Sequence, residues 1–216
     1  MRIIDLFAGI GGIRLGFERH GCVCVFTSEW DRDAQLMYAA NFGEQPHGDI
    51  TQVDPRDIPE HDILLGGFPC QPFSIIGKSL GFADTRGTLF FNIEEILRVK
   101  RPYALLLENV KRLHSHDQGR TLGVIVERLR NLGYHVHVKV LNALHYGVPQ
   151  KRERIFIVGF RDNIRFEFPR PVGQYPPLAD VLDPDEAADP SLFASPLIAH
   201  NRLLKVKGTP VNPSIW

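Results

Sequence analysis

The chain has 216 residues with 25 basic and 25 acidic side chains, so its formal net charge at pH 7 is zero. A neutral chain has no overall field that would draw it to nucleic acid or to an anionic membrane, so such a partner has to be argued from local motifs. The apolar content of 44% is that of a globular protein, and the apolar runs are too short to span a bilayer.

Cysteine usage indicates the cellular compartment. The chain contains three cysteines, an odd number, and its first residues, MRIIDLFAG, lack the basic start and long apolar stretch of a secretory signal. Disulfide frameworks belong to oxidising compartments. We therefore expect a cytoplasmic protein with no disulfides.

Short apolar segments alternate with amphipathic ones through the first three quarters of the chain. Apolar runs predict strands at 2–7, 23–29, 61–67, 103–109, 135–142 and 154–160. Helical periodicity predicts helices at 13–19, 31–41, 89–99 and 122–132, the second beginning at acidic residues. This alternation is typical of an α/β domain whose mostly parallel sheet carries helices on both faces.

The composition changes after residue 160. Nine of the 16 prolines lie beyond it, and the segment PRPVGQYPPLADVLDPDEAADP has no sustained period. We predict one α/β domain at 1–160, followed at 161–216 by a proline-rich linker and the beginning of a further region.

The turn DLFAGIGG after the first strand is the first candidate site. Its glycines, among them Gly9 and Gly11, allow close approach to a ligand, and Glu29 at the end of the second strand is placed to accept hydrogen bonds from ribose hydroxyls. Trp30 could stack on an adenine ring, and Asp49 lies in a third loop. The structural alternatives are a core aromatic for Trp30 and a helix cap for Asp49. The pattern lacks the spacing G-x-G-x-x-G, which disfavours a nicotinamide dehydrogenase, and S-adenosylmethionine is the favoured ligand.

A second candidate site is Cys70 in GFPCQPFS. It follows a strand of the predicted sheet at the carboxyl end, where α/β proteins bind ligands, and Pro69 and Pro72 restrict the backbone around it. We interpret Cys70 as a nucleophile and Cys22 and Cys24 as small buried residues.

Charged residues near two later strands complete the candidate site. Glu108 ends the most apolar strand, either as a cap of the next turn or as an acid that holds or donates a proton. Arg152 and Arg154 alternate onto one side and could hold a phosphate and a base carbonyl, although such charge runs are usually solvated. His114 and His116 have no further ligands nearby, so we expect no metal.

With these motifs in this order, the sequence resembles the DNA (cytosine-5) methyltransferase family. The resemblance is close to the HhaI-type bacterial modification methylases of that family. The segments DLFAGIGG, EW, GDI, GFPCQPFS, RGTLFF, ENV and PQKRER carry the resemblance, over about residues 2–160. It implies a Rossmann-like fold that binds S-adenosylmethionine and no metal, and double-stranded DNA as partner. The residues implied to line the donor pocket are Phe7, Gly9, Ile10, Gly11, Glu29, Trp30, Asp49, Ile50, Pro69 and Leu89.

The resemblance also implies roles around a flipped-out cytosine. Cys70 would be the nucleophile, Glu108 would contact the pyrimidine N3, and Arg154 would hold the base carbonyl with Arg152 nearer the phosphates. The loop at about 73–87 would close over DNA, in a bacterial enzyme of a restriction-modification system acting at the nucleoid.

The chain departs from the family pattern at its end. The target-recognition region and a final Gly-Asn-Ser segment do not appear before Trp216. A truncated enzyme, one half of a split enzyme whose other chain carries the recognition domain, and a non-catalytic remnant that binds the donor therefore all stay open. RNA is the alternative substrate.

Overall fold

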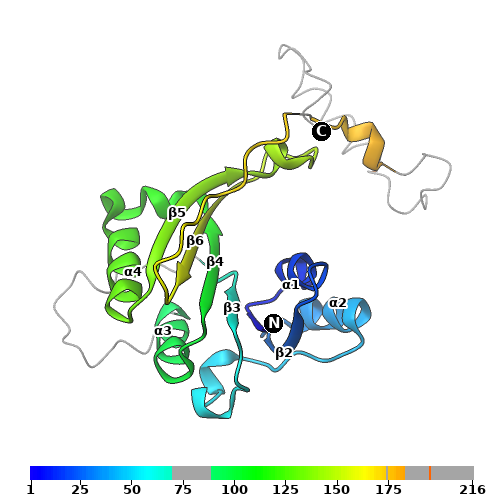
Figure 1. Cartoon of the computed structure of the whole chain (residues 1–216). Helices are drawn as coiled ribbons and strands as arrows, with labels where there is room; N and C mark the ends of the chain where they lie inside the picture. Colours follow the sequence, from blue (N-terminus) through cyan, green and yellow to red (C-terminus); the bar gives the residue numbers. More distant parts are fainter. Residues whose placement is uncertain (70–88, 174, 183–194, 196–216) are drawn as a thin grey trace. The chain divides into compact units, whose positions relative to one another are not determined.

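The computed structural model describes residues 1–69, 89–173, 175–182 and 195 (Figure 1). They belong to two compact units. The first comprises Met1–Leu141 and Glu153–Phe168, and the second comprises Asn142–Arg152 and Pro169–Trp216. The first unit holds the sheet and its helices, and the division of function between 1–160 and 161–216 stays a prediction.

One sheet with strand order β2-β1-β3-β4-β6-β5 forms the centre of the first unit. β1 pairs in parallel with β2 and β3, β3 pairs in parallel with β4, and β6 runs antiparallel to β4. The prediction of a mostly parallel sheet is confirmed. The bounds are β1 (Arg2–Leu6), β2 (Val23–Ser28), β3 (Ile63–Gly66), β4 (Ala104–Val110), β5 (His135–Asn142) and β6 (Glu153–Phe160).

Helices cover both faces of this sheet, as the alternation of segments predicted (Figure 1). Because neighbouring strand residues point to opposite faces, Ile4 and Leu6 join the core under α3 and α4, whereas Ile3 joins a smaller cluster with Ile13 and Phe17 of α1. The helices are α1 (Gly12–Glu18), α2 (Arg32–Phe42), α3 (Leu89–Lys100) and α4 (Arg120–Asn131). None of the described helices is long and apolar enough to cross a membrane.

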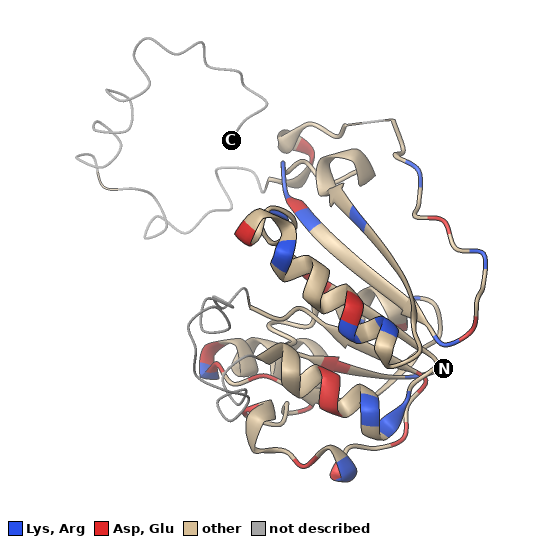
Figure 2. Cartoon of the chain, turned by 90° about the vertical axis from the view of Figure 1, so that its left-hand side faces the viewer, with Lys and Arg blue, Asp and Glu red and all other residues tan. Residues whose placement is uncertain are grey.

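A buried acid joins the two helices on one face. Glu94 of α3 is 6% exposed, and its carboxylate oxygens accept from Arg98 at 3.0 Å and from Arg128 of α4 at 2.9 Å. The Arg128 guanidinium also lies 4.7 Å from the Phe91 ring centroid. On α3 the acidic residues precede the basic ones, and on α4 a single acid lies among basic residues (Figure 2). The pairs in which Glu94 takes part hold α3 to α4 and thereby fix the layer over the core.

Aromatic packing extends the first unit beyond residue 160. Phe166 lies with its ring centroid 5.2 Å from that of His137 on β5 and 5.3 Å from that of Phe160 at the end of β6. The second unit has its own hydrogen bonds, among them one from the Val172 amide to the His145 carbonyl at 2.9 Å.

Candidate active site

The turn after β1 is tied to the end of β2. The Ala8 amide donates to the Ser28 carbonyl at 3.1 Å, the Gly9 amide donates to Glu29 Oε2 at 2.7 Å, and the Gly11 amide closes the turn on the Ala8 carbonyl at 2.8 Å. Glu29 is 7% exposed, and its other oxygen accepts from the Asp31 amide at 2.9 Å. Glu29 therefore fixes the turn to the end of β2.

A cavity of about 470 Å³ opens beside this turn. Its volume lies in the usual range for small-molecule sites. Residues of five segments line it, and all but three of them were predicted site residues: Phe7, Ser28, Glu29, Trp30, Asp49, Ile50, Thr51, Gly67, Pro69 and Leu89. The other three are Ser28, Thr51 and Gly67. Each of them is next in sequence to, or two residues from, a predicted site residue, and this neighbourhood was the available signal.

The structure answers the alternatives for Trp30 and Asp49. Trp30 is 73% exposed, so it is not a core aromatic, and it lies at the cavity wall. Asp49 does cap a short 3-10 helix (Ile50–Gln52), because its Oδ1 accepts from the Thr51 amide at 2.9 Å. It also lines the cavity, so the cap is compatible with the predicted role in ligand binding, which stays a prediction.

Three residues that were predicted to bind the methyl donor lie in the turn without lining the cavity. The Gly9 amide is engaged by Glu29, and Ile10 is 57% exposed with its carbonyl accepting from Asn41 Nδ2 at 3.0 Å. Gly11 has φ of 88°, and a Cβ there would lie 2.0 Å from Cε2 of Phe42. The Gly11 position is therefore required for packing against α2.

Glu108 and Arg154 form an ion pair on the α1 face of the sheet. Arg154 Nε lies 2.8 Å from Glu108 Oε1, and the two side chains are 23% and 22% exposed. The antiparallel register places Arg154 opposite Val110, two residues beyond Glu108 on the same face. β6 thus brings a guanidinium to the acid from 46 positions away in sequence.

Gly67 connects the ion pair to the cavity. It lines the cavity, and a Cβ placed on it would lie 3.6 Å from Glu108 Oε2 and 3.5 Å from Cδ1 of Ile13. The other carboxylate oxygen, Oε2, is thus next to the cavity wall.

Asn109 holds the segment that leads to Cys70. It is 2% exposed, and its Nδ2 donates to the Phe68 carbonyl at 2.9 Å while its Oδ1 accepts from the Val110 amide at 2.8 Å. Sequence reasoning assigned no role to Asn109. Its place inside the ENV segment, directly after Glu108, was the signal.

Other predicted site residues lie apart or outside the described residues. Cys70 and the loop at 73–87 are outside them. Arg152 belongs to the second unit, where its amide donates to Asn142 Oδ1 at 3.0 Å. Within the described part of the chain, no three His, Cys, Asp or Glu side chains are grouped to hold a metal, and His116 bonds Thr121 instead.

Comparisons with known proteins identify the family of the chain. Residues 1–192 match the family C-5 cytosine-specific DNA methylase. The Type II methyltransferase M.NgoBI of Neisseria gonorrhoeae is 62% identical over the whole chain and M.HaeII of Haemophilus aegyptius 60%, and the chain spans 68% of each. M.HhaI of Haemophilus parahaemolyticus is 53% identical over 88% of the chain, which spans 59% of that relative.

Solved structures share the fold. Spodoptera frugiperda DNMT2 superposes with a TM-score of 0.63 at 27% identity, over 78% of this chain and 52% of its own. The Entamoeba histolytica methyltransferase EhMeth superposes at 0.69 with 20% identity, over 86% and 60%, which speaks for the fold alone. Together with the family match, these structural similarities show that the fold is Rossmann-like. The chain belongs to the C-5 cytosine-specific DNA methylase family, whose members are DNA (cytosine-5) methyltransferases.

Proposed function

We propose that this chain is the catalytic part of an enzyme that transfers a methyl group from S-adenosylmethionine to C5 of a flipped-out cytosine in double-stranded DNA, within a restriction-modification system. The observation that carries the proposal is the position of Gly67, which borders both the cavity and Oε2 of Glu108. A donor and an acceptor bound on its two sides would be adjacent. The names of the curated relatives favour DNA over the RNA alternative.

The cavity residues fit S-adenosylmethionine. The buried Glu29 carboxylate can accept from ribose hydroxyls, because each of its oxygens keeps a free lone pair beside the amide it already binds. The exposed Trp30 ring offers a face for adenine, and Phe7 and Ile50 add apolar wall. The donor would supply an electrophilic methyl group on a sulfonium.

The acid and its partners fit an activated cytosine. C5 of cytosine is a poor nucleophile, and addition of the Cys70 thiolate at C6 would turn the ring into an enamine. Glu108 would hydrogen bond or protonate N3, and Arg154, which orients Glu108, would hold the base carbonyl. C5 would then take the methyl group, lose its proton to a base and expel Cys70 as the C6–S bond breaks.

Access to C6 requires the base to leave the stack, since a thiolate approaches perpendicular to the ring. The loop at 73–87 would close over the DNA, and Arg152 would contact phosphate. Because the curated relatives extend beyond the length that this chain spans, the recognition of a target sequence would come from a further region or a separate chain. Such an enzyme would act on bacterial nucleoid DNA.

Calorimetry tests whether S-adenosylhomocysteine binds at the proposed methyl-donor site. We expect Glu29→Ala to weaken binding by about tenfold or more, as loss of hydrogen bonds to a charged group costs ~1.5–3 kcal/mol. The matched control is Asp33→Ala, an exposed acid in the first turn of α2 that does not line the cavity. Equal affinity in Glu29→Ala and the unsubstituted chain would place the ribose elsewhere.

The covalent step is tested with DNA that carries 5-fluorocytosine. Fluorine cannot leave C5 as a cation, so elimination stops and the protein stays bound to the DNA. The chain is mixed with the C-terminal third of a relative, the methyl donor is added, and the denatured adduct is mapped by peptide mass. We expect the adduct on Cys70 and none in Cys70→Ser, since a hydroxyl is a far poorer nucleophile than a thiolate. An adduct on Cys22 or Cys24 would contradict the assignment.

A further inference from the structure

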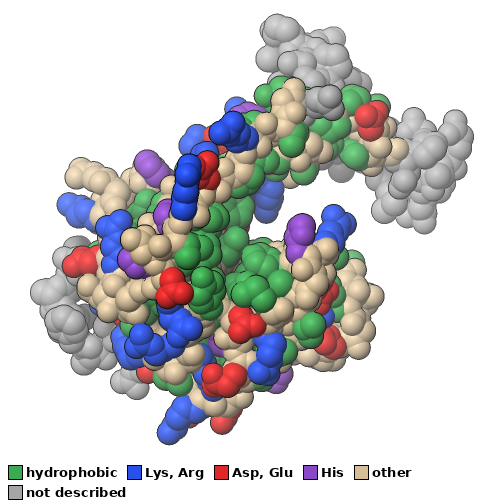
Figure 3. All heavy atoms as spheres, viewed as in Figure 1, with side chains coloured by type: hydrophobic (Ala, Val, Ile, Leu, Met, Phe, Trp, Pro, Cys, Tyr) green, Lys and Arg blue, Asp and Glu red, His purple; other side chains and the backbone are tan. Residues whose placement is uncertain are grey.

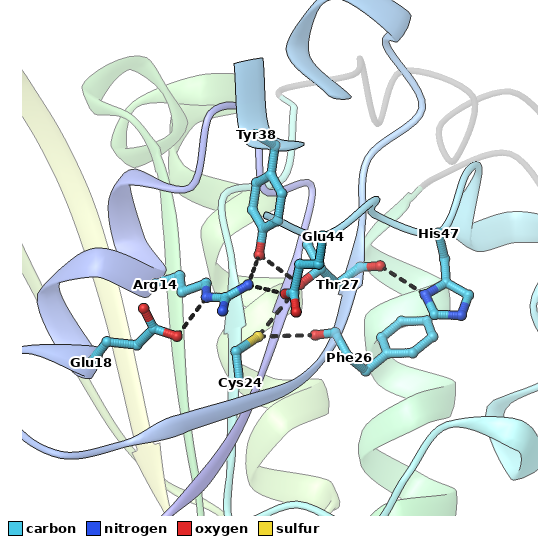
Figure 4. A network of polar contacts seen from close by, with 8 residues as sticks. All are labelled: Arg14, Glu18, Cys24, Phe26, Thr27, Tyr38, Glu44 and His47. Carbon is cyan, nitrogen blue, oxygen red and sulfur yellow. Dashed lines mark hydrogen bonds and ion pairs between the residues drawn. The ribbon is translucent and has the colours of Figure 1, made fainter. Parts of the chain in front are cut away.

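The donor-binding turn is backed by a buried polar network that the proposed chemistry does not use (Figure 4). Its centre is Arg14 of α1, whose side chain is only 8% exposed. The Arg14 guanidinium pairs with Glu18 at 2.7 Å and with Glu44, and it donates to the Tyr38 hydroxyl. Burial of a guanidinium costs desolvation free energy, which is offset only when its N–H donors are paired and hydrogen-bonded.

This network reaches the turn through α2. Tyr38 and Phe42 are one helical turn apart and present their rings to Arg14, with ring centroids 4.6 Å from each other and the guanidinium 4.3 Å from that of Phe42. The Phe42 ring occupies the space beside Gly11 where a Cβ would lie. Asn41, between them in sequence, holds the Ile10 carbonyl.

The network also reaches the strand that carries Glu29. The Tyr38 hydroxyl lies 2.7 Å from Thr27 Oγ1, and Thr27 is 4% exposed. Ser28 and Glu29 follow directly and line the cavity. Arg14 therefore reaches Gly11, two residues after Gly9, through Phe42, and it reaches Thr27, two residues before Glu29, through Tyr38. Gly9 and Glu29 are the two partners of the hydrogen bond that ties the turn to β2.

We propose that Arg14 is a positioning residue for donor binding, which acts through Phe42 on the glycine turn and through Tyr38 and Thr27 on the strand bearing Glu29. It touches no part of the cavity itself. The inference rests on the proposed donor site for its functional consequence, and on the described contacts alone for its structural one.

The structural consequence is measured without any ligand. Hydrogen exchange of single amides is followed by NMR in Arg14→Met, in Arg14→Lys and in Tyr38→Phe, which keeps the ring but removes the bridge to Thr27. We expect exchange of the Gly9 amide to rise by about tenfold in Arg14→Met and by less in Arg14→Lys and Tyr38→Phe, whose losses are partial. The amide of Gly133, which bonds Arg130 at the end of α4, serves as the internal reference, and Arg19→Met on the exposed end of α1 is the matched variant.

The functional consequence is measured with S-adenosylhomocysteine. Arg14→Met should weaken binding by about three- to tenfold, and the loss should shrink toward nothing in a Glu29→Ala background, because contacting residues that act as a unit are not additive. Arg19→Met should bind as the unsubstituted chain does.

Two results would overturn the inference. One is a Gly9 amide that exchanges no faster in Arg14→Met and Tyr38→Phe, or rises only together with that of Gly133, which would make Arg14 a source of general stability. The other is full additivity with Glu29→Ala. Absence of any binding by the unsubstituted chain would instead refute the donor site, and the amide exchange would still decide the role of Arg14. If Arg14→Met does not fold, Tyr38→Phe carries both measurements.

Discussion

Substitution of Gly11 by alanine tests how tightly the glycine turn is packed. The backbone has φ of 88° there, and an added Cβ would lie 2.0 Å from Cε2 of Phe42. The left-handed conformation costs an alanine about 1–2 kcal/mol. The ring could swing outward only by leaving the Arg14 guanidinium at 4.3 Å and the Tyr38 ring at 4.6 Å, which adds the ~1–3 kcal/mol typical of overpacking.

Two neighbouring glycines separate these contributions. Gly9 also has a positive φ, of 56°, but nothing lies within 4 Å of its Cβ position, so Gly9→Ala carries the backbone cost alone. Gly12 has neither a positive φ nor a neighbour, so Gly12→Ala should stay within ~0.5 kcal/mol of the unsubstituted chain. Allowing for the smaller entropy of an unfolded alanine chain, we expect losses of about 2–4 kcal/mol for Gly11→Ala and about 1 kcal/mol for Gly9→Ala.

Urea unfolding followed by circular dichroism measures these losses, and thermal unfolding should show a fall of ~2–4 °C per kcal/mol at this chain length. In a Phe42→Ala background, the cost of Gly11→Ala should fall to that of Gly9→Ala, since the clash is gone. If Gly11→Ala is no more destabilising than Gly9→Ala, the Phe42 ring does not pack as described and the reasoning fails.

Three further substitutions test the buried groups of the site. Burial raises the pKa of Asp5 to about 7, while the Arg14 amide and charge lower it and the Glu29 charge raises it further. The folded chain therefore binds more protons than the unfolded chain, so the contribution of Asp5 to the free energy of unfolding is present below about pH 4 and is lost as the pH rises to about 7. Asp5→Asn should flatten this pH dependence when stability is measured by urea unfolding at several pH values. Asn109→Ala leaves the buried Phe68 carbonyl without its donor and should cost about 1–3 kcal/mol of unfolding free energy, whereas an unchanged midpoint would mean that water replaces the amide. Arg154→Lys should slow trapping of 5-fluorocytosine DNA while the affinity for the methyl donor stays unchanged. The guanidinium fork can orient Glu108 and hold a base at the same time, whereas the single ammonium of a lysine cannot. A parallel loss of affinity for the methyl donor would show that the ion pair also shapes the cavity.

Local patterns in the sequence predicted the strands and most of the cavity. Because open α/β sheets bind ligands beyond the carboxyl ends of their strands, Glu29 after β2, Pro69 after β3 and Asp49 in the loop between these strands could be expected at one site. The start of α2 at acidic residues was also predicted from a local pattern, and Asp31 Oδ1 accepts from the Ala34 amide at 2.8 Å.

Contacts between distant segments escaped sequence reasoning. The partner of Glu108 depends on the antiparallel register of β6, which no local pattern reveals. The close packing at Gly11 depends on Phe42, 31 residues later, so this requirement for glycine could not be seen in the local pattern. Arg14 looked like an ordinary charged residue of an amphipathic helix, and only the placement of α2 buries it.

The late place of β6 in the chain has a consequence for the order in which the protein is made. Every described residue of the cavity has left the ribosome tunnel before Arg154 does, and 65 residues separate Leu89 from Arg154. At about 5–20 residues per second, that interval lasts roughly 3–13 s. Glu108 leaves the tunnel 19 residues after Leu89, so for the remaining 46 residues it is present without Arg154 beside it. A ribosome stalled within those 46 residues would therefore expose every described residue that lines the cavity, together with an acid whose arginine partner has not yet emerged.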